Sequence, residues 1–157
     1  MNSINTAVIK LLNKRKIKYR LLLHKNPAYT VESAARERGV DKSILIKSIL
    51  LVNSVNEYIM VCMRGNTELN SKALRKVLPS GWRRFRFATE REILEVTGYE
   101  IGAVNPVGIS DDICIYFDVK IKGLEKVNIS SGDPMAGIEM LSIDLINLVK
   151  PEFVEIS

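Results

Sequence analysis

Apolar residues recur along this chain with two different spacings, and these spacings predict where helices and strands lie. Ile4, Val8 and Leu11 keep helical spacing, which predicts an amphipathic helix over residues 3–16. Thr30 is a suitable N-cap for a second helix over residues 31–38, which Gly39 would end. Three further helices are predicted over residues 67–78, 89–98 and 143–149.

Short apolar or alternating runs between the helices predict the strands. Residues 44–52 and 57–63 flank a turn and read as a hairpin, and residues 83–87 alternate basic and aromatic side chains. The other strands are predicted over residues 19–24, 113–117, 126–129 and 138–141. Since no linker or repeat interrupts this order, we expect one α+β domain over residues 1–157, with a mainly antiparallel sheet covered by helices.

Lys47 lies in the middle of the most apolar run of the chain, residues 44–52. An unpaired buried ammonium is costly, so a lysine in a buried strand usually has an anionic partner or a ligand. Strand alternation puts Lys47 on the face of Leu45, Ile49 and Leu51. Two interpretations stay open: a long side chain that keeps its ammonium in water, or a functional cation at a cleft.

Composition is that of an ordinary globular protein, with 46% hydrophobic and 26% charged residues among 157. No apolar stretch is long enough to span a membrane, and the first 18 residues lack the apolar core of a signal peptide. Cys62 and Cys114 lie in apolar runs and are expected to be buried thiols, as suits a reducing cytoplasm. The net charge of +5 permits a polyanionic partner such as RNA without requiring one.

Several common chemistries lack their residues. One histidine and two separated cysteines give no zinc-binding spacing, and neither glycine-rich nucleotide motif is present. No serine elbow accompanies His24, and Asp111 beside Asp112 is typical of a turn rather than of an acid and base pair. We therefore expect no metal and no cofactor, and an enzyme here would work without either.

Two loops remain as candidates for chemistry. Residues 98–108 contain three glycines and Pro106, and such a loop can direct backbone N–H groups at a carbonyl or a developing oxyanion. Residues 130–134 form a turn of small residues after a strand. Both are equally compatible with ordinary connections, because glycine and proline occur in most loops.

Together, these features resemble the YbaK family, free-standing relatives of the editing domain inserted in bacterial prolyl-tRNA synthetases. The resemblance covers about residues 19–149 and rests on the order of its motifs. These are Lys47-Ser48 in an apolar strand, the Gly-Tyr-x-x-Gly-x-x-x-Pro-x-Gly loop from Gly98 to Gly108, and Ile-Ser-Ser-Gly at residues 129–132, with His24, Thr30, Ala34-Ala35 and Asp118 in the expected places.

The resemblance implies hydrolysis of the ester between a wrong amino acid and the end of a tRNA, in a mixed α/β domain with a curved, largely antiparallel sheet. It implies that Lys47 is the residue most tied to activity, and that the Gly102–Pro106 loop positions the aminoacyl group and the terminal adenosine. Amides of Gly102 and Ala103 would face the ester carbonyl, and water would be the nucleophile. The other expected substrate-binding residues are Pro106, Gly108, Ser131, Gly132, Thr30 and His24, the last of which could equally be structural.

The expected partners are the acceptor end of a mischarged tRNA and, as a further option, an aminoacyl-tRNA synthetase, with the protein a monomer or a weak dimer. Basic residues beside Trp82 would bind the acceptor stem, unless they form an ordinary solvated face. These are Arg83, Arg84 and Arg86 with Lys76, Lys72 and Arg75, and residues 14–20 are a second basic cluster.

Two departures leave the edited amino acid open. The alanine-clearing branch of the family tends to carry Lys-Asn where this chain has Lys47-Ser48, and a late histidine that is missing after His24. Cysteine, serine or another small residue therefore competes with alanine as the substrate. Two rivals to an editing enzyme also stay open: a non-catalytic module that binds tRNA or a synthetase, and an esterase for a small acylated metabolite.

Overall fold

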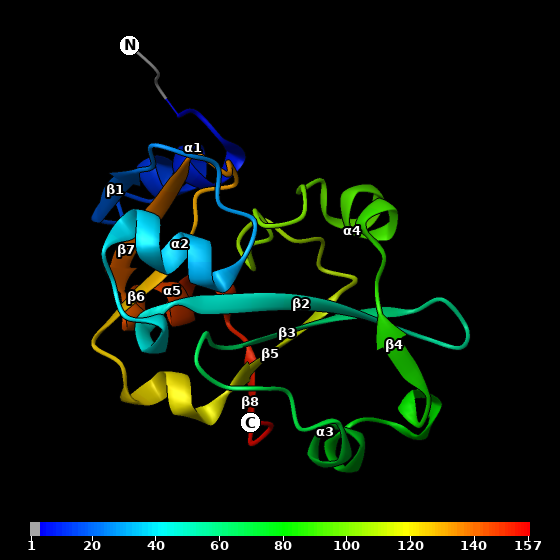
Figure 1. The fold of residues 1–157 in the computed structure, drawn as a ribbon. Helices are drawn as coiled ribbons and strands as arrows, with labels where there is room; N and C mark the ends of the chain where they lie inside the picture. The colour runs from blue at the N-terminus through cyan, green and yellow to red at the C-terminus, as the bar shows by residue number, and fades with distance from the viewer. Residues whose placement is uncertain (1–3) are drawn as a thin grey trace.

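The computed structural model describes residues 4–157, which fold into two sheets with helices packed around them (Figure 1). The α-helices are α1 (Ala7–Lys14), α2 (Val31–Arg38), α3 (Ser71–Val77), α4 (Glu90–Thr97) and α5 (Ser142–Val149). Short 3-10 turns occupy η1 (Lys42–Ile44), η2 (Ser80–Trp82) and η3 (Val119–Gly123). The α+β class predicted from the sequence is confirmed.

The strands divide into an antiparallel sheet and a mixed one. The first sheet has the order β1-β7-β6 and the second the order β4-β2-β3-β5-β8. Their bounds are β1 (Tyr19–Leu23), β2 (Ile46–Asn53), β3 (Tyr58–Arg64), β4 (Phe85–Phe87), β5 (Cys114–Asp118), β6 (Lys126–Ser130), β7 (Ala136–Leu141) and β8 (Glu152–Val154). Pairing is antiparallel except for β3 with β5 and β5 with β8. An isolated bridge between Leu45 and Asn128 links the two sheets, so β2 begins beside β6.

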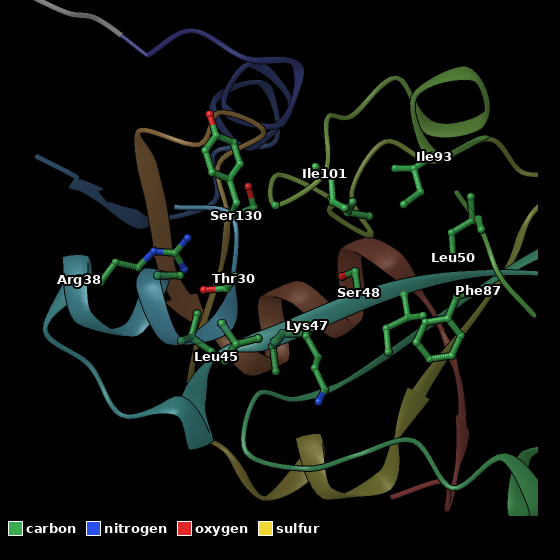
Figure 2. A pocket seen from close by; sticks show the side chains of 18 residues that line it. Thr30, Arg38, Leu45, Lys47, Ser48, Leu50, Phe87, Ile93, Ile101 and Ser130 are labelled. Atoms are coloured by element: carbon green, nitrogen blue, oxygen red, sulfur yellow. The ribbon is translucent and has the colours of Figure 1, made fainter. Parts of the chain in front are cut away.

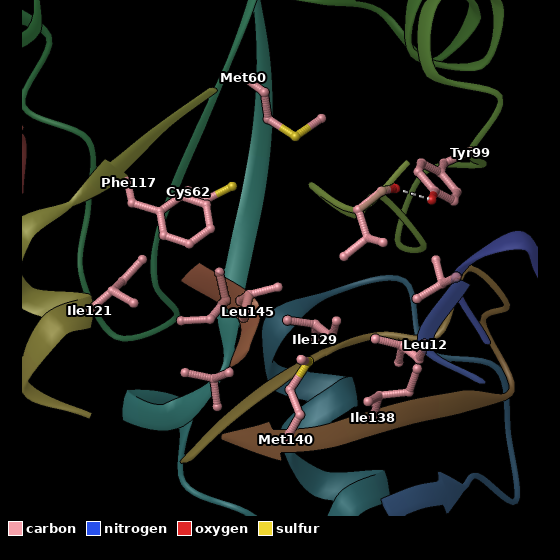
Figure 3. Packing of buried hydrophobic residues seen from close by; sticks show 14 of the residues in the cluster. Leu12, Met60, Cys62, Tyr99, Phe117, Ile121, Ile129, Ile138, Met140 and Leu145 are labelled. Atoms are coloured by element: carbon pink, nitrogen blue, oxygen red, sulfur yellow. Dashed lines mark hydrogen bonds between the residues drawn. The ribbon is translucent and has the colours of Figure 1, made fainter. Parts of the chain in front are cut away.

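The main core lies between the two sheets and is covered by α1 and α5. Figure 3 shows Phe117 and Ile121 from one sheet region facing Ile129, Ile138 and Met140 from the other. A second cluster on the far face of β2 and β3 packs under α3. β2 is therefore buried on both faces along its second half, which is why its sequence reads as continuous Ile, Leu and Val.

Several boundaries differ from the sequence prediction for local reasons. The first helix begins at Ala7, because the Thr6 side chain caps it, and the predicted residue 3 lies outside the described residues. The third helix begins at Ser71 rather than at 67, because Asn70 provides its N-cap. Residues 42–44 form a 3-10 turn, so β2 starts two residues later than predicted.

The expectation that both cysteines are buried is wrong for one of them. Cys62 is buried in the core, whereas Cys114 is exposed at the start of β5. Burial raises the pKa of the Cys62 thiol to about 12, so this thiol stays protonated. Within residues 4–157, no helix is long and apolar enough to cross a membrane.

Candidate functional site

A cavity of about 290 Å³ opens between α2, β2 and the loop that follows α4 (Figure 2). Four stretches that are distant in the sequence form its walls: Tyr29 to Arg38, Leu45 to Leu50, Phe87 to Ile93, and Ile101 to Val104. Ser130 at the end of β6 completes the lining. Most of these side chains are apolar, and a few polar groups interrupt them, as is typical of a binding site for a small ligand.

The wall formed by β2 is an unpaired strand edge. Strand β4 pairs only with residues 51–53 of β2, so residues 47–49 have no partner strand on that side. Leu50 accepts a hydrogen bond from the Ala88 N–H (2.9 Å) on this same side. Because backbone groups in an antiparallel ladder alternate in direction, the N–H and C=O of Ser48 face the cavity too. This explains why five consecutive residues of β2, with Leu45 just before it, line the cavity.

The Ser48 side chain also lies on the cavity side of β2 (Figure 2). Its Oγ accepts a hydrogen bond from the Cys62 thiol, with Sγ and Oγ 3.3 Å apart. The hydroxyl proton of Ser48 is thereby left free to be donated to a ligand. Sequence reasoning named this residue only as part of a motif, although its hydroxyl and backbone N–H are the polar groups that β2 offers to the cavity.

Lys47 is half-buried, and its ammonium points away from the cavity (Figure 2). Nζ donates a hydrogen bond to the backbone carbonyl of Thr67, on the other face of β2. Among residues 4–157, no carboxylate forms an ion pair with Lys47. The backbone of Lys47 borders the cavity, but its charge reaches the cavity only if the side chain rotates around the open strand edge.

The glycine loop approaches the cavity through Gly102. This residue has a φ of +82°, and a Cβ atom here would lie 2.6 Å from the Tyr29 Cα and 3.0 Å from the Ala28 carbonyl oxygen. Only glycine therefore fits where this loop meets the segment before α2. The expectation that the Ala103 amide faces an ester carbonyl is wrong, because this N–H donates to the Glu100 carbonyl (3.0 Å) inside the turn.

The remaining predicted loop residues lie elsewhere. Pro106 and Gly108 border a second cavity, of about 360 Å³, on the other side of the loop. Ser131 is fully buried and its Oγ donates to the Ala136 carbonyl (2.7 Å), and Gly132 packs against Thr6 and Tyr99. None of these four residues lines the first cavity. Asn105 donates to the Ser130 carbonyl and ties the loop to β6.

Thr30 and His24 hold the segment that leads into α2. Thr30 lines the cavity, and its Oγ1 accepts from the Ser33 N–H (3.1 Å) as the N-cap of the helix. His24 is buried behind the lining, where its Nδ1 is 2.8 Å from the Pro134 carbonyl oxygen. Asp118, which accompanied the motifs in the sequence, lies buried at the end of β5 and accepts from the Ser157 hydroxyl.

Arg38 is a cavity residue that sequence reasoning missed. Its Nε donates to the Nε2 atom of His24 (3.0 Å), so the imidazole is neutral, with its proton on Nδ1. Burial lowers the pKa of the His24 imidazole, in agreement with this neutral form. A signal was present in the sequence, because Arg38 follows Val31 and Ala34 at helical spacing and so shares their inward face.

The basic residues near β4 are only partly available. Nη1 and Nη2 of Arg86 bind the Glu92 carboxylate, at 2.7 and 3.0 Å, and these bonds, with the hydrogen bond from the Thr89 N–H, lower the pKa of Glu92 to about 2. Arg75 lies over the Phe85 ring, 4.6 Å from its centroid. Arg83, Arg84 and Lys76 are exposed and make no ion pair within residues 4–157.

Comparison with known proteins shows which sequences this chain resembles. A model of the aminoacyl-tRNA editing domain matches residues 25–148. An uncharacterized protein of Bacillus subtilis, YwhH, is 32% identical over 116 residues, which are 74% of this chain and 72% of that protein. The proline–tRNA ligase of Bacillus pumilus is 32% identical over 102 residues, 65% of this chain but only 18% of the ligase. The chain thus corresponds to a small part of the length of such ligases.

Two solved structures share the fold over nearly their whole length. The hypothetical protein APE2540 has a TM-score of 0.83 and 25% identity, covering 95% of this chain and 97% of its own. A protein assigned provisionally as a trans-editing enzyme for prolyl tRNA synthetase has a TM-score of 0.81 and 22% identity, covering 99% of both chains. Since the family model spans most of the chain and includes the walls of the cavity, the chain belongs to the aminoacyl-tRNA editing domain family.

Proposed function

We propose that this protein is a trans-acting deacylase, which hydrolyses the ester that joins a wrong amino acid to the end of a tRNA. The observation that carries the proposal is the cavity at the open edge of β2, in a chain that belongs to the editing-domain family. Hydrolysis of an aminoacyl ester needs little chemical assistance, because this ester is already activated. Binding, an oxyanion donor and a water molecule suffice.

The oxyanion donors would be the backbone N–H and the hydroxyl of Ser48. Both lie on the cavity side of β2: the N–H points away from the β2–β3 ladder, and the hydroxyl accepts from the Cys62 thiol of β3 and keeps its own proton to donate. A backbone N–H on a buried strand is fixed in place before the substrate arrives, which is what oxyanion stabilisation requires. Gly102 would lie on the other side of the ester. Its backbone packs against the Tyr29 backbone, and no larger residue fits there.

Lys47 would act after its side chain leaves the Thr67 carbonyl. The missing neighbour strand at residues 47–49 gives a four-carbon side chain a route around the edge of β2. Its ammonium would then neutralise negative charge on the terminal phosphate or on the developing oxyanion. Substrate binding would draw Lys47 into the cavity, because a carbonyl is a weaker partner for an ammonium than an anion is.

The mouth of the cavity offers aromatic surface for the terminal adenosine. Tyr29 and Phe87 come from different walls of the cavity and are 54% and 59% exposed, so their rings are accessible to a ligand. Bases of single-stranded RNA ends stack readily on such rings. The volume of about 290 Å³ is large enough for an aminoacyl group.

A panel of mischarged tRNAs tests this function, including alanyl- and cysteinyl-tRNA(Pro). We expect the wild type to hydrolyse at least one of them and Lys47→Ala to lose about a hundredfold in kcat/KM. Lys42→Ala is the matched control, since Lys42 is an exposed lysine on the neighbouring turn, where it pairs with Glu32 (3.8 Å). It should retain wild-type activity.

Two outcomes would favour other functions. Binding of tRNA without hydrolysis across the panel would favour a non-catalytic module. Hydrolysis of small acyl esters that uncharged tRNA does not inhibit would favour a metabolite esterase. Equal activity of the wild type and Lys47→Ala would leave a deacylase in place but remove Lys47 from its mechanism.

A further inference from the structure

Arg38 is half-buried and carries a charge that the mechanism above does not use. Its Nε is occupied by His24, but its Nη1 is buried and has no hydrogen-bond partner within residues 4–157. In the same part of the chain, no carboxylate lies within 4.0 Å of its guanidinium. A buried guanidinium nearly always has an anionic or carbonyl partner, because an unsatisfied charged donor is costly.

The position of this guanidinium is fixed on two sides. His24 is held by the Pro134 carbonyl (2.8 Å) and accepts from Nε, so the imidazole orients the guanidinium plane. On the other side the group lies directly on β7 at Gly137, where a Cβ atom would come within 2.0 Å of Nε. A group held in this way loses little entropy when a ligand binds, which favours tight recognition.

Arg38 is one of the residues that line the same cavity. Figure 2 shows Arg38 at the end away from Phe87 and Ile93, with its guanidinium on the side of Thr30 and Ser130. Val31 and Ala34 lie on the same face of α2, so this end combines apolar side chains and two hydroxyls, of Thr30 and Ser130, with the one charge. Burial lowers the pKa of Arg38 to about 10, which leaves the group charged at neutral pH.

We propose that Arg38 binds an anionic oxygen group of the substrate at this end of the cavity. Two sources carry that chemistry: a phosphate of the RNA end, or the carboxylate of an acidic aminoacyl side chain. Either would supply the partner that Nη1 lacks, through a charge-assisted hydrogen bond. The identity of the substrate rests on the proposed deacylase function, whereas the anion site itself does not.

Variants of two arginines on one helix test the site kinetically. Arg38→Met removes the charge and keeps much of the volume, and Arg36→Met removes an exposed charge of the same helix as the control. On full tRNA, a phosphate ligand predicts about a tenfold or greater loss in kcat/KM for every amino acid with Arg38→Met alone. A carboxylate ligand predicts that loss only for aspartyl and glutamyl esters. A kcat/KM for Arg38→Met equal to that of the wild type on every substrate of the panel would count against both.

A binding measurement keeps the test valid even if no tRNA is hydrolysed. The wild type should bind AMP more tightly than adenosine if Arg38 holds a phosphate, or aspartate more tightly than asparagine if it holds a carboxylate. Calorimetry should show that preference lost in Arg38→Met and kept in Arg36→Met. If Arg38→Met fails to fold, Arg38→Lys replaces it and should weaken the preference. No preference in the wild type, or the same preference in Arg38→Met, would overturn the proposal.

Discussion

At the residue scale, Gly102 should tolerate a side chain less well than Gly98. Gly98 and Gly102 both have positive φ values, +76° and +82°, but only Gly102 lacks space for a Cβ. Gly98→Ala should therefore cost only the left-handed backbone penalty of about 1 kcal/mol. Gly102→Ala should cost roughly 1–3 kcal/mol more, because it pushes against the Tyr29 backbone. Denaturant unfolding measures both, and equal midpoints would show that the loop relaxes freely.

His24 should make the protein less stable at mildly acidic pH. Burial holds the pKa of the folded imidazole below 6.5, and protonation would set a second donor against Arg38 Nε. The unfolded chain then binds the proton more readily, so the free energy of unfolding falls as pH drops below about 6.5. His24→Gln should lose this dependence between pH 7 and 5. Because the chain has one histidine, a single imidazole NMR signal reports the pKa directly, and a value above 6.5 would contradict the assignment.

Single residues of the site were predictable where a local rule identifies them. Thr30 as an N-cap follows from a short sequence pattern, and Gly102 was expected at the site through the family resemblance; both line the cavity. Arg38 and the Ser48 amide were missed for a different reason. Their importance depends on a partner that is absent: a carboxylate for Arg38, and a neighbouring strand for Ser48. A local sequence pattern does not indicate which partner a residue will lack in the folded protein.

At the element scale, the sequence predicted the elements that carry their own signals. The capping boxes of α2 and α4 and the terminal glycines Gly39 and Gly98 place both helices correctly. Strand β8 was missed, because three residues after Pro151 have no periodicity to detect. The start of α3 was placed too early, since the Thr67 Oγ1 donates to the Arg64 carbonyl and the Thr67 carbonyl accepts from Lys47. Tertiary contacts hold that segment out of the helix.

At the scale of the whole molecule, the cavity results from pairings that join distant segments. Parallel pairing of β3 with β5 and the short overlap of β4 with β2 leave the first half of β2 exposed at one edge. The bridge from Leu45 to Asn128 then brings β6 and Ser130 to that edge. A one-dimensional pattern predicts that these strands exist but not which edge remains open. The position of the site, unlike the fold class, therefore required the structure.

The net charge of +5 should act on RNA through residues beside the mouth of the cavity. Arg83 and Arg84 precede Phe87, which lines that mouth, whereas Arg86 is committed to Glu92. A double variant, Arg83→Ala with Arg84→Ala, should weaken tRNA binding and reduce the salt slope of log Kd by about one to two. Lys14→Ala with Arg15→Ala removes the same charge at the end of α1 and is the control. A larger effect of the α1 variant would move the RNA path to the opposite side of the first sheet.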